Sequence, residues 1–447
     1  MAASPLVFGP HTLADVLIRD VHVLDPRAGL DERRDLSVRA GVIAEIGPAR
    51  TLEPADGAEV LEGEGRHLFP GFVDPHVHLR TPGQEHKEDL ETGTRAAAAG
   101  GFCAVLGMPN TSPVVDSAPL LRSLRDAAAR DARIPVGFLP AITRGMNGEE
   151  LTEMAELREE GAVGFTDDGR PVVSAGMLRK ALQYQRLCGG VLALHEEDPS
   201  LSGKGAMHEG DVSAALGVAG IPSVSESTMI ARDAALAGYE GGRIHIQHLS
   251  AVASIEAIEA AKQAGVKITC EASPHHLLLT HEDVRTLDTR MKMNPPLREE
   301  PDRQALIAGL RSGVIDCVAT DHAPHARDEK EVPFEQAPMG TTGLETAFAA
   351  LYTELVIPGI LPLELLIERM TVGGELFDLP VPLIAPGEPA NATLVDLSSE
   401  WTAGEHGWES RSENCCFAGR TLRGRVLLTL AAGAVAWRER AFSVVGA

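Results

Sequence analysis

Between about residues 68 and 325 the chain repeats one pattern, a short apolar run followed by a segment whose apolar residues have helical spacing. The runs expected to be strands are 67–73, 102–106, 134–139, 162–165, 191–194, 244–246, 266–270 and 315–319. The expected helices include 88–99, 118–129, 149–160, 174–187, 254–264 and 302–312. Eight strand–helix units in roughly 250 residues predict an α/β fold, a (β/α)8 TIM barrel. A doubly wound sheet is disfavoured because no glycine-rich phosphate turn follows the first strand.

Both ends of the chain instead alternate apolar and polar residues, which is typical of strands with one buried face. The alternating segments are 15–23, 38–46, 392–396 and 425–430. Residues 398–411 between the last two are expected to form a loop. Because chain termini often lie close together, we expect 1–66 and 385–447 to form one small composite β-sandwich domain and 67–384 to form the barrel. Two unrelated extensions would show the same alternation.

Composition and charge limit the partners of the protein. The 447 residues include 64 Asp and Glu against 40 Lys and Arg, a formal net charge of −24 at pH 7. Such a surface repels phosphate backbones and anionic lipids, so neither nucleic acid nor a membrane is an expected partner. Residues 1–12 lack the basic start of a secretory signal, and the six cysteines form neither a CxxC pair nor a disulfide framework. We therefore expect a cytoplasmic protein.

The first expected barrel strand ends in residues that suit a metal ion, Asp74-Pro75-His76-Val77-His78-Leu79-Arg80. Residues two apart on a strand face the same side, so His76 and His78 can reach one ion together. A lone His-x-His is weak evidence, but four later strands also end in polar residues. These are Asp167, Asp168, His195, His248 and Asp321. Since barrel enzymes place their active sites at the carboxyl ends of strands, this inventory predicts two close divalent ions.

Several segments together resemble the dihydroorotases of the amidohydrolase superfamily, in particular their class I bacterial branch. Two resemble the signature segments, 74–80 and Ala319-Thr320-Asp321-His322-Ala323-Pro324-His325, the latter followed by Lys330. The others are 107–111, 165–169, 293–298 and 340–346. The likeness extends from the amino-terminal strands to about Val395. It implies a dihydroorotase, which reversibly cyclises N-carbamoyl-L-aspartate to L-dihydroorotate with loss of water, the third step of de novo pyrimidine (UMP) biosynthesis.

The resemblance further implies two zinc ions per subunit, bridged by Asp168 and a hydroxide, one of which can be absent. The implied metal ligands are His76, His78, Asp168, His195, His248 and Asp321. Asp321 is also the implied catalytic residue, because it would carry a proton to or from the ring nitrogen. Asp167 remains the alternative bridge, since sequence does not fix which neighbour at a strand end faces the metals. A carboxylated lysine is excluded there, because no lysine lies between Lys87 and Lys180.

The residues expected to bind the substrate follow partly from chemistry and partly from the resemblance. A guanidinium can hold a carboxylate through two parallel hydrogen bonds, and Arg80 directly follows the metal pair. The complete expected set is His78, Arg80, Asn110, Asn294, His325, Met339 and Gly340. Asn110 and Asn294 also fit a second interpretation, as turn formers beside prolines.

Two other functions share parts of this pattern. A hydantoinase or allantoinase would have the same barrel and His-x-His start, but the missing lysine and the presence of Arg80 argue against both. A non-catalytic structural partner of aspartate transcarbamoylase would not need the full ligand set, although association with that enzyme stays open. From the resemblance we also expect a homo-oligomer, a dimer.

Overall fold

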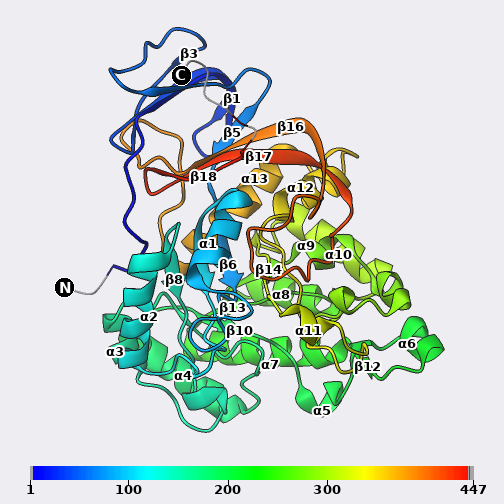
Figure 1. The fold of residues 1–447 in the computed structure, drawn as a ribbon. Helices are drawn as coiled ribbons and strands as arrows, with labels where there is room; N and C mark the ends of the chain where they lie inside the picture. The colour runs from blue at the N-terminus through cyan, green and yellow to red at the C-terminus, as the bar shows by residue number, and fades with distance from the viewer. Residues whose placement is uncertain (1–3, 441, 443–447) are drawn as a thin grey trace.

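Strands from both ends of the chain form one mixed sheet in the computed structural model, which describes residues 4–440 and 442. Its order is β18-β17-β16-β5-β1-β2-β3, and β4 pairs with β1. The strands are β1 (Val16–Asp25), β2 (Leu30–Arg39), β3 (Val42–Pro48), β4 (Glu59–Glu62), β5 (His67–Pro70), β16 (Ala392–Thr402), β17 (Thr421–Ala431) and β18 (Ala434–Arg438). This sheet lies at the top of Figure 1. The two chain ends therefore pair in one sheet.

The mixed sheet has an apolar core of its own. Ile18, Leu36, Ile43 and Leu394 in this core are fully buried. The turn between β1 and β2 forms because Asp25 Oδ1 accepts hydrogen bonds from two backbone amides that follow it, at 3.0 and 3.1 Å. The buried apolar core and a defined turn thus explain why the amino-terminal segment folds as antiparallel strands.

Two parallel sheets, ordered β6-β7-β8 and β15-β14-β13-β10-β9, form the rest of the strand framework. Their strands are β6 (Phe72–Val77), β7 (Phe102–Gly107), β8 (Val136–Phe138), β9 (Phe165–Thr166), β10 (Leu192–Leu194), β13 (Arg243–Ile246), β14 (Lys267–Ala272) and β15 (Cys317–Val318). Beyond β8, the Thr166 amide donates to the Pro140 carbonyl at 3.0 Å. Beyond β15, the His78 amide donates to the His322 carbonyl at 2.9 Å. The two sheets are therefore hydrogen-bonded to each other at both edges.

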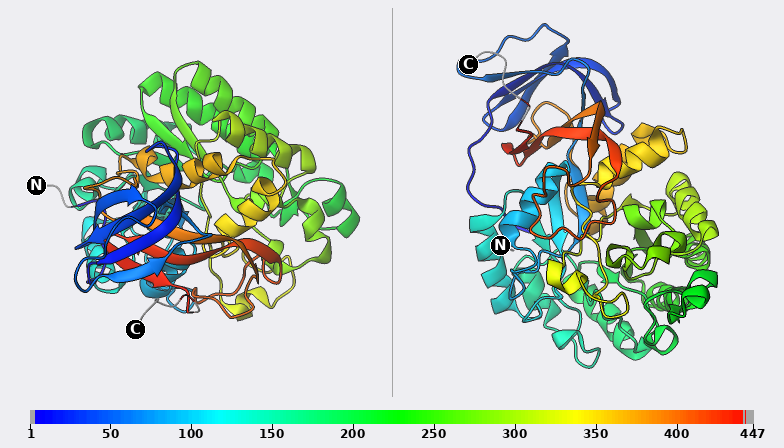
Figure 2. Two further views of the ribbon diagram at one scale, coloured as in Figure 1. Left: turned by 90° about the horizontal axis from the view of Figure 1, so that it is seen from above. Right: turned by 45° about the vertical axis from the view of Figure 1, so that its right-hand side comes forward.

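Helices alternate with the parallel strands and lie outside them in Figures 1 and 2, below the mixed sheet. The longer ones are α1 (Leu90–Ala99), α2 (Ala118–Asp131), α4 (Ala175–Cys188), α7 (Val224–Glu240), α8 (Val252–Gln263), α10 (Glu300–Ser312) and α13 (Leu363–Thr371). The shorter ones are α3 (Met154–Glu159), α5 (Pro199–Ser202), α6 (Asp211–Leu216), α9 (Pro274–Leu278), α11 (Arg327–Lys330) and α12 (Ala347–Leu351). No helix in the part of the chain that the structure describes is both long and apolar enough to cross a membrane.

The structure corrects two details of the expected elements. The run 67–73 is two strands, because β5 pairs with β1 and β16 whereas β6 begins the parallel framework. Gly71 separates them, and a side chain there would place a Cβ 2.6 Å from that of Cys103. The expected loop at 398–411 begins later, because β16 continues to Thr402, which pairs with Thr421. A short parallel pair, β11 (Met207–His208) and β12 (Gly220–Ile221), was not expected at all.

Candidate functional site

All the expected metal ligands lie together at the carboxyl ends of parallel strands. His76 is in β6 and His78 follows it, and the remaining ligands follow β9, β10, β13 and β15. All are at most 6 % exposed: His76, His78, Asp168, His195, His248 and Asp321. His76 and Asp321 are 245 positions apart in the sequence, yet both belong to this one buried site.

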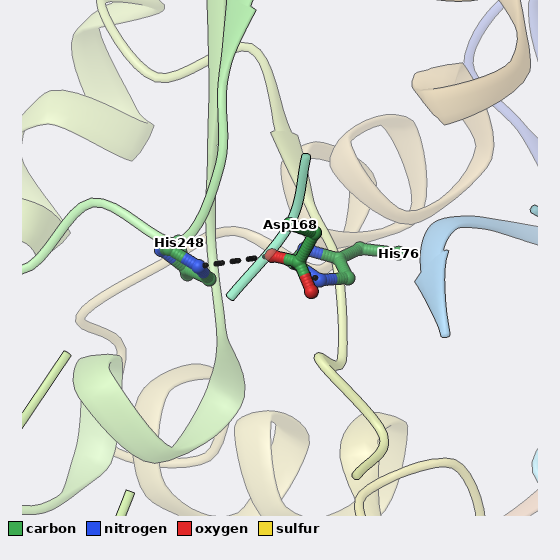
Figure 3. A group of neighbouring side chains, drawn as sticks. All are labelled: His76, Asp168 and His248. Atoms are coloured by element: carbon green, nitrogen blue, oxygen red, sulfur yellow. Dashed lines mark ion pairs between the residues drawn. The ribbon is translucent and has the colours of Figure 1, made fainter. Parts of the chain in front are cut away.

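Asp168 lies at the centre of this group, between His76 and His248 in Figure 3. Its Oδ1 is 3.4 Å from His76 Nε2, 3.6 Å from His248 Nε2 and 3.8 Å from His195 Nδ1. Its Oδ2 is 3.4 Å from His78 Nε2. One carboxylate therefore faces four imidazoles, which is the arrangement required of a ligand shared by two ions.

Asp321 faces the same two ring nitrogens of His76 and His78 as Asp168 does. Its Oδ1 is 3.1 Å from His78 Nε2 and 3.5 Å from His76 Nε2. The Asp321 backbone has a φ of 47°, in the left-handed region that is uncommon for residues other than glycine. The structure therefore holds this carboxylate against the two histidines through an unusual backbone conformation.

The donor set suits metal ions. The ligand atoms of His76, Asp168 and His248 lie within 4.8 Å of one another, as do those of His76, His78 and Asp321. Two buried ring nitrogens, His76 Nε2 and His248 Nδ1, have no hydrogen-bond partner among the described residues. Leaving a buried polar atom without a hydrogen bond costs about 1–3 kcal/mol. An ion that is bound by the lone pair of such a ring nitrogen removes that cost. Imidazole and carboxylate are the donors that zinc and related ions prefer.

The electrostatics of the site also favour positive charge. Burial alone would lower the pKa of His76, but the nearby charges of Asp168, Glu271 and Asp321 hold that pKa well above its ordinary value. Burial would raise the pKa of Asp168, and the charge of His76 reverses this and holds it well below the usual range. The carboxylates thus stay ionised and stabilise a cation at this point.

Asp167 has a different environment from its neighbour. Its Oδ1 accepts hydrogen bonds from the backbone amides of Ile142 and Thr143 at 2.8 and 3.0 Å, and its Oδ2 accepts one from the Thr143 hydroxyl. Burial raises the pKa of Asp167 to about 6. Asp167 therefore fixes the segment that follows β8, and Asp168 is the carboxylate that faces the histidines.

Sequence reasoning missed Glu271, a buried residue of β14 that supports the ligands. Its Oε1 lies 2.6 Å from His76 Nδ1, and its Oε2 lies 3.0 Å from His245 Nε2. By accepting the Nδ1–H of His76, Glu271 fixes the tautomer whose Nε2 lone pair faces Asp168. A carboxylate near the end of an expected strand was the available signal, but neither alternation nor the resemblance distinguished it from a core polar residue.

Replacing Glu271 with Gln should therefore weaken divalent-ion binding by about 10–100-fold, the usual effect of losing a partner that orients a metal ligand. The reason is that the amide no longer stabilises one tautomer of His76 through a charged acceptor. Competition with a chromophoric chelator measures the affinity. The matched control is Glu375→Gln, which breaks only the exposed ion pair with Arg27. Equal affinities in the Glu271 variant and the wild type would rule this role out.

Two of the expected substrate-binding residues lie beside the ligands. Asn110 Oδ1 accepts from His78 Nδ1 at 2.8 Å, and its Nδ2 lies 3.5 Å from Asp168 Oδ2. Arg80 is 8 % exposed, and its Nε donates to the Pro324 carbonyl at 3.1 Å. Burial lowers the pKa of Arg80 to about 10, opposed by the charges of Asp321 and Asp168, so the guanidinium remains cationic. Its Nη atoms make no hydrogen bond or ion pair with residues 4–440 or 442.

The other expected residues lie on two loops. His325 Nε2 donates to the Met339 carbonyl at 2.8 Å, and burial together with the charge of Arg80 lowers the pKa of His325 to about 2. Gly340 has a φ of 133° and packs against Ala323, so a side chain there would clash. Asn294 Nδ2 instead donates to Glu197 Oε2 at 2.6 Å and lies 3.4 Å from His195 Nε2. A neutral His325 beside Arg80 and an Asn294 beside His195 thus border the ligand group.

Comparison with known proteins gives the family. A model described as Dihydro-orotase-like matches residues 65–254. A protein named dihydroorotase from Anaeromyxobacter sp. (strain K) is 45% identical over 434 residues, covering 96% of this chain and 99% of the relative. Another of that name from Pelotomaculum thermopropionicum is 43% identical over 426 residues, covering 95% and 99%.

Solved structures give the same fold. An L-hydantoinase (dihydropyrimidinase) from Arthrobacter aurescens matches with a TM-score of 0.84 and 25% identity, over 95% of this chain and 96% of the other. The crystal structure of dihydropyrimidinase from Brevibacillus agri NCHU1002, at 22% identity and a TM-score of 0.83, shows the same architecture. Relatives named dihydroorotase are 43–45% identical to this chain along nearly its whole length. The chain therefore belongs to the dihydroorotase-like family.

Proposed function

We propose that this protein is an enzyme acting on a cyclic amide, which reversibly cyclises N-carbamoyl-L-aspartate to L-dihydroorotate with loss of water. The observation that carries the proposal is Asp168, whose carboxylate faces four metal-ligating histidines. Arg80 lies nearby, and its Nη atoms have no partner among the described residues. The family relationship and the motifs of the class I bacterial dihydroorotases support it. The reaction would be a step of pyrimidine biosynthesis.

Two zinc ions per subunit are the proposed cofactor. His76, His78, Asp168 and Asp321 would hold the first, and Asp168, His195 and His248 the second. When bound, zinc would polarise the substrate carbonyl and lower the pKa of water to about 7. The unpaired nitrogens of His76 and His248 and the mixture of imidazole and carboxylate donors support zinc over magnesium or calcium, which prefer oxygen alone.

Asp321 is the proposed catalytic residue. In ring closure its carboxylate would accept the proton of the attacking ureido nitrogen, and in ring opening it would return that proton to the leaving ring nitrogen. The contacts of Oδ1 with His76 and His78 support this role, because they keep the carboxylate at the centre of the site. Asn110 would hold His78 in place through its Nδ1, and Asn294 would act at the opposite side, next to His195.

Arg80 is the proposed binding group for the substrate carboxylate that does not react, with His325, Met339 and Gly340 forming the wall beside it. Replacing Arg80 with Gln should lower kcat/KM for dihydroorotate by about 10²-fold, the loss of a charge-assisted hydrogen-bond pair. Dihydrouracil, the same ring without the carboxylate, serves as the control substrate, and its kcat/KM should change little. Steady-state kinetics with both rings measure this. An equal loss for both rings would contradict the assignment.

The strand arrangement supports a closed (β/α)8 barrel for residues 67–384, since hydrogen bonds join both edges of the two parallel sheets. Residues 1–66 and 385–447 are proposed to form the composite β-sandwich domain, with β5 from the chain just beyond residue 66 completing its sheet. A dimer and association with aspartate transcarbamoylase stay predictions from the resemblance, and a cytoplasmic location stays a prediction from the cysteine content and the start of the sequence.

A hydantoinase is the second candidate, because of the likeness to L-hydantoinase over nearly the whole chain. Ring opening of dihydroorotate, hydantoin and allantoin by the zinc-loaded protein separates the candidates. We expect dihydroorotate to be opened with the highest kcat/KM. Faster opening of hydantoin, or no opening of dihydroorotate alone and with aspartate transcarbamoylase present, would overturn the proposal.

A further inference from the structure

A second group of metal-ligating side chains lies outside the site described above. It consists of His208 in β11, His281 at the start of the 3-10 helix η2 (His281–Thr286) and Glu299, the N-cap of α10. One ligand atom from each lies within 4.8 Å of the other two. We propose that these three side chains bind one transition-metal ion of the zinc class, separate from the proposed catalytic pair.

The histidines of this group are buried and incompletely bonded. His208 is 6 % exposed and His281 is 8 % exposed. The buried Nδ1 of His281 has no hydrogen-bond partner among the described residues. A buried ring nitrogen without a partner destabilises the fold, and an ion would remove that penalty where it accepts the lone pair.

His208 lies between Arg298 and Glu299. Arg298 Nη1 donates to the Ile221 carbonyl at 2.8 Å and to His208 Nδ1 at 3.3 Å. His208 Nε2 lies 3.8 Å from Glu299 Oε1.

Gly210 lies beside two of these ligands, His208 and Glu299. A Cβ at Gly210 would lie 3.0 Å from Glu299 Oε1 and 3.4 Å from His208 Nε2. The backbone of Gly210 is extended, with a φ of −179°, so other residues could adopt its conformation. The Glu299 side chain is 44% exposed, which gives an ion a path from solvent.

The donors and the local charge define the class of ion. Two imidazoles and one carboxylate suit zinc and its neighbours in the first transition series, with water completing a tetrahedral shell. Glu282 Oε1, 3.5 Å from His281 Nε2, adds negative charge. Arg298 opposes a cation, and Glu226, 3.8 Å from Arg298 Nη2, offsets part of its charge. We therefore expect weaker binding than at the six-ligand site.

An ion here would add a link between segments that are distant in sequence. β11 lies in the long excursion between β10 and β13, and η2 and Glu299 lie between β14 and β15. β12 and α6, which belong to this excursion, lie at the lower right of Figure 1. Because the ion would bind the folded chain only, it should raise the melting temperature as zinc concentration rises.

The test counts zinc per chain after equilibrium dialysis of the full chain, with His281→Asn as the principal variant. The matched control is His22→Asn, which removes a histidine from the mixed sheet. We expect His281→Asn to bind one ion fewer than the wild type and the control, and to keep dihydroorotate turnover. Equal zinc content in His281→Asn and the wild type would overturn the proposal.

Two further variants test the same site without that histidine change. Glu299→Gln removes a ligand whose side chain is partly exposed, so this variant is less prone to misfold. Gly210→Ala keeps every ligand and fills the space beside them, and should weaken this zinc affinity at least tenfold. The Asp168→Asn background is expected to release zinc from the proposed catalytic site. Zinc that stays bound in this background, and is lost when His281→Asn is added, reports the second site alone. The result is independent of whether the protein turns over dihydroorotate. Retention of that zinc in all three variants would contradict the site.

Discussion

Asp321→Asn is expected to lower kcat for dihydroorotate ring opening by about 10²–10⁴-fold, the usual contribution of a positioned acid–base group. The amide keeps the volume and one oxygen that can face His76 and His78, so bound zinc should remain close to the wild-type amount. It cannot accept and return a proton. Stopped-time assays combined with metal analysis separate the two effects.

The control for this variant is Asp316→Asn, at the opposite end of the same segment, where the carboxylate instead pairs with Lys262 at 2.7 Å. The control should change stability rather than kcat. A rate for Asp321→Asn within about threefold of the wild type, at full zinc occupancy, would remove its role in proton transfer.

Asp168→Asn should impair zinc binding and activity, whereas Asp167→Asn should lower stability, although the two residues are neighbours. Asp168 faces four imidazoles, so its loss should release zinc and lower kcat/KM by about 10³-fold, equivalent to several kcal/mol of transition-state stabilisation. Asp167 accepts hydrogen bonds from Ile142 and Thr143, so its loss should cost about 1–3 kcal/mol of stability.

Zinc content and thermal unfolding of the two variants measure this difference. We expect Asp167→Asn to unfold at a lower temperature with its zinc content unchanged. If Asp167→Asn released zinc and Asp168→Asn retained it, the assignment of the bridging carboxylate would be reversed.

The strand framework could be predicted because each buried parallel strand is a short apolar run between helical segments. The run 67–73 shows where that reasoning fails: one apolar stretch spans two sheets, and only the close packing of Gly71 on Cys103 marks the change. β11 and β12 could not be predicted, because two-residue strands carry no periodicity.

The candidate ligands could be predicted because strand ends in a parallel framework converge. The distinction between Asp167 and Asp168 could not, since it depends on hydrogen bonds to the loop after β8. Glu271 was missed because its importance comes from its distance to His76, which lies 195 positions away. His208 belongs to a two-residue strand and His281 to a short 3-10 helix, and such short elements show no sequence pattern that specifies their side-chain directions.

The most direct test of the whole account is the approach to equilibrium from both sides. The zinc-loaded protein is incubated with L-dihydroorotate in one sample and N-carbamoyl-L-aspartate in another, and both compounds are quantified with time. The account predicts that both samples reach the same ratio, and that removal of zinc stops both reactions. A protein that is fully loaded with zinc and converts neither compound, while it opens hydantoin, would contradict it.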